Sequence, residues 1–216
     1  MRSIQKITFL SILLFTGIFT GKSQTYVLIP DANFASYLKA SIPSAIKGNS
    51  LNIASTLVTA ETQSINVSGQ NIKDLSGIQY FTSLTWLDCS QAGLTKLATL
   101  PNSLKFLDCG SNNLTTLPAL PNSLTTLNCY FNFLSDLPTL PNSLTNLNCQ
   151  FNSITNLPAL PAALDMLQCQ YNQIASFPSF PNSLTYMDCT SNPYTCLPNY
   201  VLPAMKSFTT TPLCGK

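Results

Sequence analysis

Cysteines are the residues of this 216-residue chain with the most potential chemistry, and six of the eight recur at one spacing. Thiolates are nucleophiles and zinc ligands, so a reactive cysteine, a redox pair and a metal site are the chemistries to weigh. The sequence has no histidine, the commonest general base and metal ligand. We call the recurrent set the cysteine column: Cys89, Cys109, Cys129, Cys149, Cys169 and Cys189.

The regular spacing of the cysteine column favours a structural role. Stretches such as Leu107-Asp108-Cys109 alternate apolar and polar residues, which predicts short strands with the cysteines facing inward. Neighbouring strands lie about 4.8 Å apart, whereas a disulfide needs Cβ atoms about 3.8 Å apart. A linear column also lacks the tetrahedral arrangement that structural zinc requires. We interpret these cysteines as buried, reduced thiols and predict no metal and no cofactor; oxidised pairs or a metal are the alternatives.

Carboxylates offer little for catalysis. The chain has only eight, and Asp88 and Asp108 are the one acidic pair at neighbouring positions of the repeat, joined more distantly by Asp188. We interpret these three as part of a solvated polar face. With no histidine and so few acids, the sequence predicts a protein that is not an enzyme.

A 20-residue repeat must position these residues. From Ser83 the chain follows the pattern S-L-x-x-L-x-C-x-x-N-x-L-x-x-L-P-x-L-P-N through five units, and a sixth begins on pattern and then departs. One unit cannot bury its own apolar residues, so stacked units must share a core. An asparagine column is expected to bond backbone groups where the chain turns; its first unit has Ala92 instead, and its members are Asn112, Asn132, Asn152, Asn172 and Asn192.

The motif L-x-x-L-x-C-x-x-N-x-L resembles the leucine-rich-repeat family, with cysteine in place of a leucine. The L-P-x-L-P-N segments look most like the short LPX-type repeats of secreted bacterial effectors. The resemblance implies an α/β-type repeat solenoid: a leucine-rich-repeat horseshoe with one parallel β-sheet on its concave face, an extended, polyproline-like convex side and a small helical N-terminal cap. The ubiquitin ligases among such effectors carry a separate catalytic domain, and only about 20 residues follow the repeats here.

The stretch IPDANFASYL, residues 29–38, is similar to the N-terminal cap of secreted, internalin-like proteins. Asp31 is placed to cap a helix there. Caps of that group can carry an acidic loop that resembles a calcium site. Here no carboxylate lies between Asp31 and Glu61, and calcium prefers several charged oxygen ligands, so we predict no calcium site.

The N-terminus has the pattern of a secretory signal. Arg2 and Lys6 precede an apolar run, Ile7 to Phe19, which is shorter than the ~20 residues that span a membrane, and small residues precede a cleavage site after Ser23. Cleavage would leave seven basic and eight acidic residues. The sequence thus predicts a secreted or cell-surface protein with no nucleic-acid partner and no membrane insertion after signal removal.

We divide the chain into a signal peptide (1–23), an N-terminal cap (24–62), the leucine-rich-repeat solenoid (63–195) and a C-terminal cap (196–216). Cys196 and Cys214 lie outside the cysteine column and 18 residues apart. In an exported protein they are the best disulfide pair, and closing such a loop would contribute about 3 kcal/mol to stability.

The outward positions of the strands predict the binding surface. Aromatic residues there are typical of binding hot spots, and we expect Trp86 and Tyr130 to be the most exposed; the alternative is an inward orientation of Phe131, Phe151 and Tyr171, beside the asparagine column. We predict an extracytoplasmic module that binds a protein partner, with a glycan-binding surface protein or a passive structural protein as alternatives. The predicted ligand-binding residues are Trp86, Asp88, Phe106, Asp108, Tyr130, Phe131, Phe151, Tyr171 and Tyr186.

Overall fold

A computed structural model describes residues 25–199 and Cys214 of the chain. The predicted signal peptide and most of the predicted C-terminal cap lie outside the described residues. No helix in the described part of the chain is both long and apolar enough to cross a membrane.

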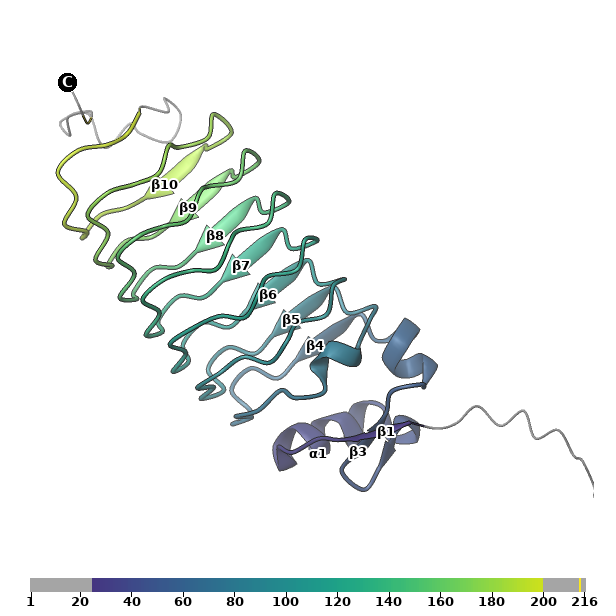
Figure 1. The fold of residues 1–216 in the computed structure, drawn as a ribbon. Helices are drawn as coiled ribbons and strands as arrows, with labels where there is room; N and C mark the ends of the chain where they lie inside the picture. Colours follow the sequence, from purple (N-terminus) through teal and green to yellow (C-terminus); the bar gives the residue numbers. More distant parts are fainter. Residues whose placement is uncertain (1–24, 200–213, 215–216) are drawn as a thin grey trace, which may run out of the picture.

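Seven parallel strands form one sheet and stack as the rungs of a solenoid (Figure 1). From β5 onward, paired residues are 20 positions apart, as Leu107 and Leu127 are in the central strands. The described return legs between β5 and β10 contain no helix, which confirms the predicted extended path. The strands are β4 (Ser64–Asn66), β5 (Trp86–Asp88), β6 (Phe106–Asp108), β7 (Thr126–Asn128), β8 (Asn146–Asn148), β9 (Met166–Gln168) and β10 (Tyr186–Asp188).

The interior of the solenoid consists of stacked columns that run through all the units. The leucine column that includes Leu87, Leu107 and Leu127 is buried, as are all six members of the cysteine column, none of which forms a disulfide. Burial raises the pKa of every column thiol; the pKa of Cys149 rises to about 12 and that of Cys189 to about 11. A thiol held protonated in this way is a poor nucleophile, so the column is a packing element.

The asparagine column bonds the backbone of two successive units, as predicted. The Asn132 amide nitrogen donates to the carbonyls of Cys109, Cys129 and Tyr130 at 3.0–3.2 Å, and its oxygen accepts from Leu114 N–H at 2.9 Å. The column begins at Asn112, whose oxygen accepts three backbone N–H groups, including that of Ala92. These bonds satisfy polar groups that the turn after each strand would otherwise bury unpaired.

The N-terminal module covers the β4 end of the solenoid (Figure 1). It contains a small antiparallel sheet of β1 (Tyr26–Leu28), β3 (Ser50–Asn52) and β2 (Ile46–Lys47). Its helices are α1 (Ala32–Ser41) and two single turns, η1 (Pro43–Ala45) and η2 (Leu57–Glu61); a third turn, η3 (Ile78–Tyr80), precedes β5.

Asp31 ties this module to the first repeat. One carboxylate oxygen accepts the N–H groups of Asn33 and Phe34 and caps α1, as the sequence predicted. The other oxygen accepts the N–H groups of Lys73 and Asp74 at 2.8 and 3.2 Å. A single side chain therefore fixes both the start of the helix and its position against the repeat.

The far end of the solenoid carries the predicted disulfide. Cys196 and Cys214 are bonded, and Cys214 N–H donates to the carbonyl of Leu197 at 2.9 Å. The bridge therefore holds the residue near the C-terminus against the chain that leaves the last unit.

Candidate functional site

The outward side of the seven-stranded sheet, which we call the sheet face, presents side chains in parallel columns. Successive strand residues point to opposite sides, so Trp86 and Asp88 face outward while Leu87 between them is buried. Because paired strands are in register, equivalent residues of successive units lie side by side. The predicted ligand-binding residues belong to four such columns.

Two aromatic rings lie at the β5–β6 end of the sheet face. Trp86 and Phe106 are paired in the strand register and stack with ring centroids 5.3 Å apart and planes 8° apart. Both are half-buried. Trp86 is thus less exposed than the sequence suggested, because the ring of the next unit covers one of its faces.

Three rings further along form what we call the aromatic column: Phe131, Phe151 and Tyr171. Their centroids are 4.1 and 4.3 Å apart and their planes differ by 8° and 10°. Phe131 is 49% exposed and Tyr171 51% exposed, while Phe151 between them is half-buried. The inward orientation that was the alternative is therefore wrong: the rings face solvent.

The backbone explains why these rings turn outward. Each of the three residues has a positive φ, between 48° and 56°, in the left-handed region that side chains other than glycine rarely adopt. This left-handed residue immediately precedes the asparagine of each unit, so the reversal that turns Asn132 inward turns Phe131 outward. Each such residue costs about 1 kcal/mol or more, which stacking of the rings offsets in part.

Tyr130 adopts a different arrangement from the one predicted. Its ring lies over Gly110 of the preceding unit, where a Cβ atom would come within 2.5 Å of it. It also meets Phe131 edge-on, with centroids 6.0 Å apart. Tyr130 is consequently half-buried, and burial, followed by the charges of Asp108 and Asp88, raises the pKa of its hydroxyl.

The three outward aspartates make local bonds rather than a catalytic pair. Asp88 accepts from the N–H and hydroxyl of Ser90, and Asp188 accepts likewise from Thr190. Asp108 accepts from Gly110 N–H and from the Asn128 amide. Partial burial raises the pKa of Asp108. Among the described residues, no group of three or more potential ligands could hold a metal ion.

Amide side chains fill the sheet face beside the aromatic column. The Gln170 amide donates to the oxygen of Gln150 in the preceding unit. The Gln170 oxygen itself is buried and has no hydrogen-bond partner. These two amide side chains are polar and uncharged.

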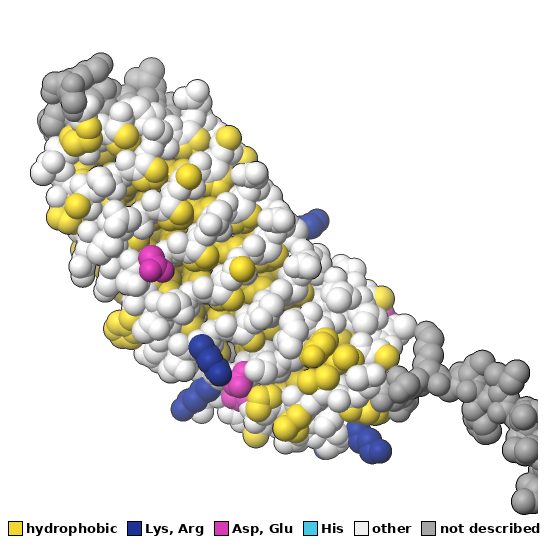
Figure 2. Space-filling model, in the orientation of Figure 1, with side chains coloured by type: hydrophobic (Ala, Val, Ile, Leu, Met, Phe, Trp, Pro, Cys, Tyr) yellow, Lys and Arg dark blue, Asp and Glu magenta, His cyan; other side chains and the backbone are white. Residues whose placement is uncertain are grey.

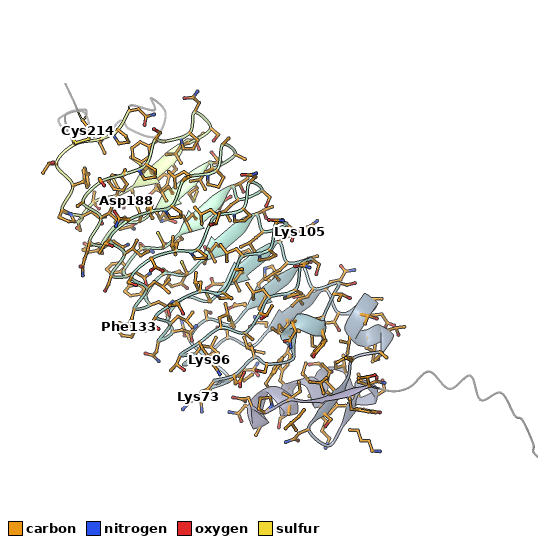
Figure 3. The ribbon with its side chains drawn as sticks, viewed as in Figure 1. Lys73, Lys96, Lys105, Phe133, Asp188 and Cys214 are labelled. Atoms are coloured by element: carbon orange, nitrogen blue, oxygen red, sulfur yellow. A yellow bond between two sulfur atoms is a disulfide. The ribbon has the colours of Figure 1, made fainter. Side chains whose placement is uncertain are left out.

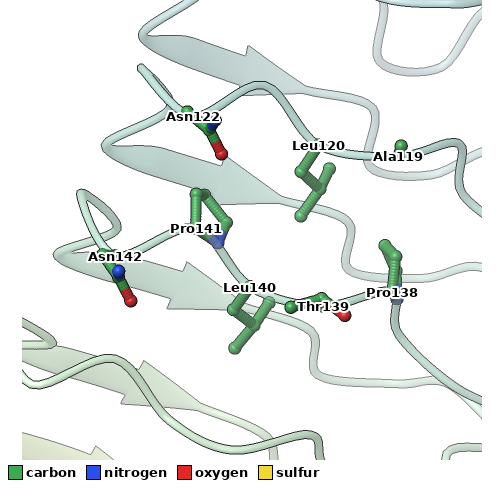
Figure 4. Close-up of a pocket in the computed structure, with 8 residues that line it drawn as sticks. All are labelled: Ala119, Leu120, Asn122, Pro138, Thr139, Leu140, Pro141 and Asn142. Atoms are coloured by element: carbon green, nitrogen blue, oxygen red, sulfur yellow. The ribbon is translucent and has the colours of Figure 1, made fainter.

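Three lysines and one exposed phenylalanine lie at the edges of the solenoid. Lys73, Lys96 and Phe133 lie along one edge and Lys105 on the opposite one (Figure 3). The face seen in Figure 2 carries a band of hydrophobic side chains along the units and few charges. An open groove of about 370 Å³ lies between two return legs (Figure 4), lined by Ala119, Leu120, Asn122, Pro138, Thr139, Leu140, Pro141 and Asn142.

Sequence reasoning missed two features of this surface. It did not foresee the left-handed backbone, although the signal was present in Asn71, Gln91, Ser111 and Ser191, polar residues at the same phase of other units. It also assigned no role to the serine that opens every unit from Ser83 on except the fifth, which opens with Ala163. The hydroxyls of Ser123 and Ser143, for example, donate to carbonyls of the preceding unit at 2.6–2.7 Å and brace the chain as it enters the strand.

Comparison with known proteins finds likeness in structure alone. No protein-family model matches the chain, and no curated protein does. The solved structures that align with it include YopM from Yersinia enterocolitica (36% identity, 57% of this chain and 28% of that one, TM-score 0.56), YopM from Yersinia pestis, a leucine-rich effector (31%, 65% and 40%, TM-score 0.62), and a Shigella effector leucine-rich-repeat domain (40%, 51% and 51%, TM-score 0.51).

The chain spans about half or less of each of these proteins. The likeness concerns the repeat solenoid. In this chain, the solenoid is the part that contains the seven-stranded parallel sheet described above. The fold class predicted from the repeat is confirmed: the chain is a leucine-rich-repeat solenoid, similar to those of these bacterial effectors.

Proposed function

We propose that the chain is an extracytoplasmic, non-enzymatic binding module that takes a protein partner on the sheet face, the concave side of the predicted horseshoe. The observation that carries this proposal is the aromatic column. Half-exposed rings leave apolar surface in water, and aromatic residues dominate binding hot spots. The leucine-rich-repeat neighbours support a protein-interaction module in general.

The stacking of the rings favours a protein over a glycan. A sugar binds aromatic side chains by laying its apolar face on the face of a ring. In the aromatic column the rings are 4.1–4.3 Å apart, so the faces between neighbours are already covered and chiefly ring edges are presented. Ring edges pack well against aliphatic and aromatic side chains of another protein.

The surroundings of the aromatic column fit a protein partner as well. The glutamines and asparagines beside it can exchange hydrogen bonds with a partner's backbone and polar side chains. Few charges lie on this surface, which leaves a polyanion little to bind. The disulfide and the predicted signal peptide both support a location outside the cytoplasm.

The test replaces the aromatic column by serine: Phe131→Ser, Phe151→Ser and Tyr171→Ser in one variant. Ser111 and Ser191 occupy the same phase with the same backbone conformation, so the variant should fold. The matched control is Phe133→Ser, which removes a 61% exposed ring outside the column at a phase where the next unit has Ser153. Both variants and the native chain are used to retain material from cell surfaces and secretions.

We expect a protein that the native chain and the Phe133→Ser variant retain and the triple variant does not. If all three chains retain the same protein, the aromatic column is not part of the binding surface. Loss of the retained material in competition with soluble oligosaccharide would favour the glycan alternative. If no chain retains a saturable partner, a passive structural role replaces the proposal.

A further inference from the structure

The terminal strand β4 has one edge that no other strand of the described residues covers, since within residues 25–199 it is last in the sheet order and pairs only with β5. Gln63 C=O and Val67 N–H bond toward β5. Backbone groups of a strand alternate in direction, so those of Ser64 and Asn66 point to the open edge. Asn66 N–H donates to the Tyr37 hydroxyl at 3.3 Å, while no described hydrogen bond engages the N–H or C=O of Ser64.

A groove of about 350 Å³ runs beside this open edge, between β4 and α1. Ligand sites begin at about this volume. Leu38, Ile65 and Phe81 are among its lining residues but are each at most 2% exposed, so the accessible lining is mainly polar. Ser64 of β4 and Tyr37 of α1 both line it. The groove therefore offers an unpaired backbone donor and acceptor within a mainly polar lining.

The charge of the groove comes from one carboxylate. Glu61 lines it, and no lysine or arginine is among the described lining residues. The Thr56 hydroxyl donates to one Glu61 oxygen at 2.8 Å, and the second oxygen has no described partner. An incoming cation would thus find a free acceptor at the end of the segment that leads into β4.

We propose that this groove binds an extended peptide segment of a protein partner, one that carries a basic side chain. One residue of the segment exchanges both backbone hydrogen bonds with Ser64, as in strand addition to a sheet edge. The basic side chain of the segment reaches Glu61. The site is separate from the sheet face and stands or falls independently of the function proposed above.

The probes are four end-capped heptapeptides of alternating threonine and valine, with one threonine in turn replaced by lysine, and four matched peptides with glutamate at the same position. Each is titrated into the isotope-labelled chain, and backbone amide NMR shifts are followed. We expect at least one lysine peptide to shift the Ser64 amide saturably and to bind about fivefold more tightly than its glutamate counterpart. If no lysine peptide moves that amide at millimolar concentration, the proposal fails.

Three variants separate the contributions of backbone and charge. Ser64→Pro removes the free donor and should abolish binding; its spectrum shows whether it folds. Glu61→Gln can still accept from Thr56 and should erase the preference for lysine. Tyr37→Phe releases Asn66 N–H to the same edge and should strengthen binding. An unchanged lysine preference in Glu61→Gln, or weaker binding to Tyr37→Phe, would overturn the assignment. The triple serine variant of the aromatic column is the control and should bind the peptides like the native chain.

Discussion

Phe131 and Asn132 are neighbours in the chain, yet they belong to two columns with different roles: Phe131 to the aromatic column and Asn132 to the asparagine column. Asn132 is 6% exposed and its amide group makes four hydrogen bonds to two units. Phe131 is half-exposed and held by one stacked ring and one edge contact. The same turn of the backbone therefore directs one side chain to the interior of the fold and the next one to solvent.

The two columns also differ in how much the units vary. From the second unit on, the inward position is always asparagine, whereas the outward position before it is Ser111, Phe131, Phe151, Tyr171 and Ser191 in turn. An asparagine there satisfies backbone groups that no other side chain of its size bonds in the same way. The outward position only has to tolerate a left-handed backbone, so it can be used for recognition.

The largest effect should come from Asn132→Ala, which leaves buried carbonyls and an N–H unpaired. We expect a loss of about 3 kcal/mol in the free energy of unfolding, measured by urea denaturation. Asn192 makes the corresponding four bonds at a partly exposed position, where water can replace them, so Asn192→Ala should cost less. If Asn132→Ala and Asn192→Ala lose the same free energy of unfolding, burial does not determine how much the missing hydrogen bonds cost.

The cysteine column should make the fold sensitive to alkali. The pKa of buried Cys149 is raised to about 12, and in the unfolded chain it returns to about 8.5. The folded state therefore holds the proton more tightly, and its stability is complete below about pH 8.5 and falls as the pH rises toward 12.

Cys149→Val removes this contribution at one position. Between neutral pH and about pH 10, the variant should lose about 2 kcal/mol less stability than the native chain, measured by denaturant unfolding at both pH values. The difference between the two chains cancels the titration of lysines and tyrosines. Parallel pH curves for the two chains would contradict a protonated, buried thiol at this position.

The aromatic column should matter less for stability than for binding. Serine at its three positions abolishes two ring stacks, each worth about 1 kcal/mol, so we expect a loss of about 2 kcal/mol or less in thermal or urea unfolding. The asparagine bonds beneath should survive, because Ser111 and Ser191 have the same backbone. A loss as large as that of Asn132→Ala would mean that the surface column also holds the fold together.

The smallest effect concerns the outward aspartates. Burial raises the pKa of Asp108, so its ionised form is disfavoured in the folded chain, and this opposes folding increasingly as the pH rises through the pKa. The next two units have asparagine at the equivalent position, Asn128 and Asn148. Asp108→Asn should therefore fit the fold and stabilise the chain by a few tenths of a kcal/mol at neutral pH. The gain should vanish in acid, and a gain that persists there would assign the effect to packing.

Much of the fold could be predicted because the period of 20 residues gives the leucine, cysteine and asparagine columns each a fixed phase. The parallel register, the extended return legs and the first member of the asparagine column follow from that repetition. The disulfide of Cys196 and Cys214 followed because both fall outside the phase. A regular repeat predicts the interior of a solenoid well, because each unit packs against the same kinds of residue in its neighbours.

The surface was harder to predict because contacts there are set by individual residues. Tyr130 is covered since Gly110 happens to leave space for its ring, and Trp86 because Phe106 follows it one unit later. The outward orientation of Phe131 depends on a positive φ, which few signals in a sequence reveal for a residue other than glycine. The edge of β4 stays free of a further strand because of how the N-terminal module packs beside it. The 20-residue repeat contains no information on that packing.

The asparagine bonds also determine how such a protein can change in length. Every bond of Asn132 and Asn152 stays within its own unit and the one before it. A duplicated block of 20 residues would bring its own asparagine, cysteine and leucines and find the same partners, so neither neighbour would lose an interaction. Gene duplication or deletion within the array can thus lengthen or shorten the surface while the two end modules stay unchanged.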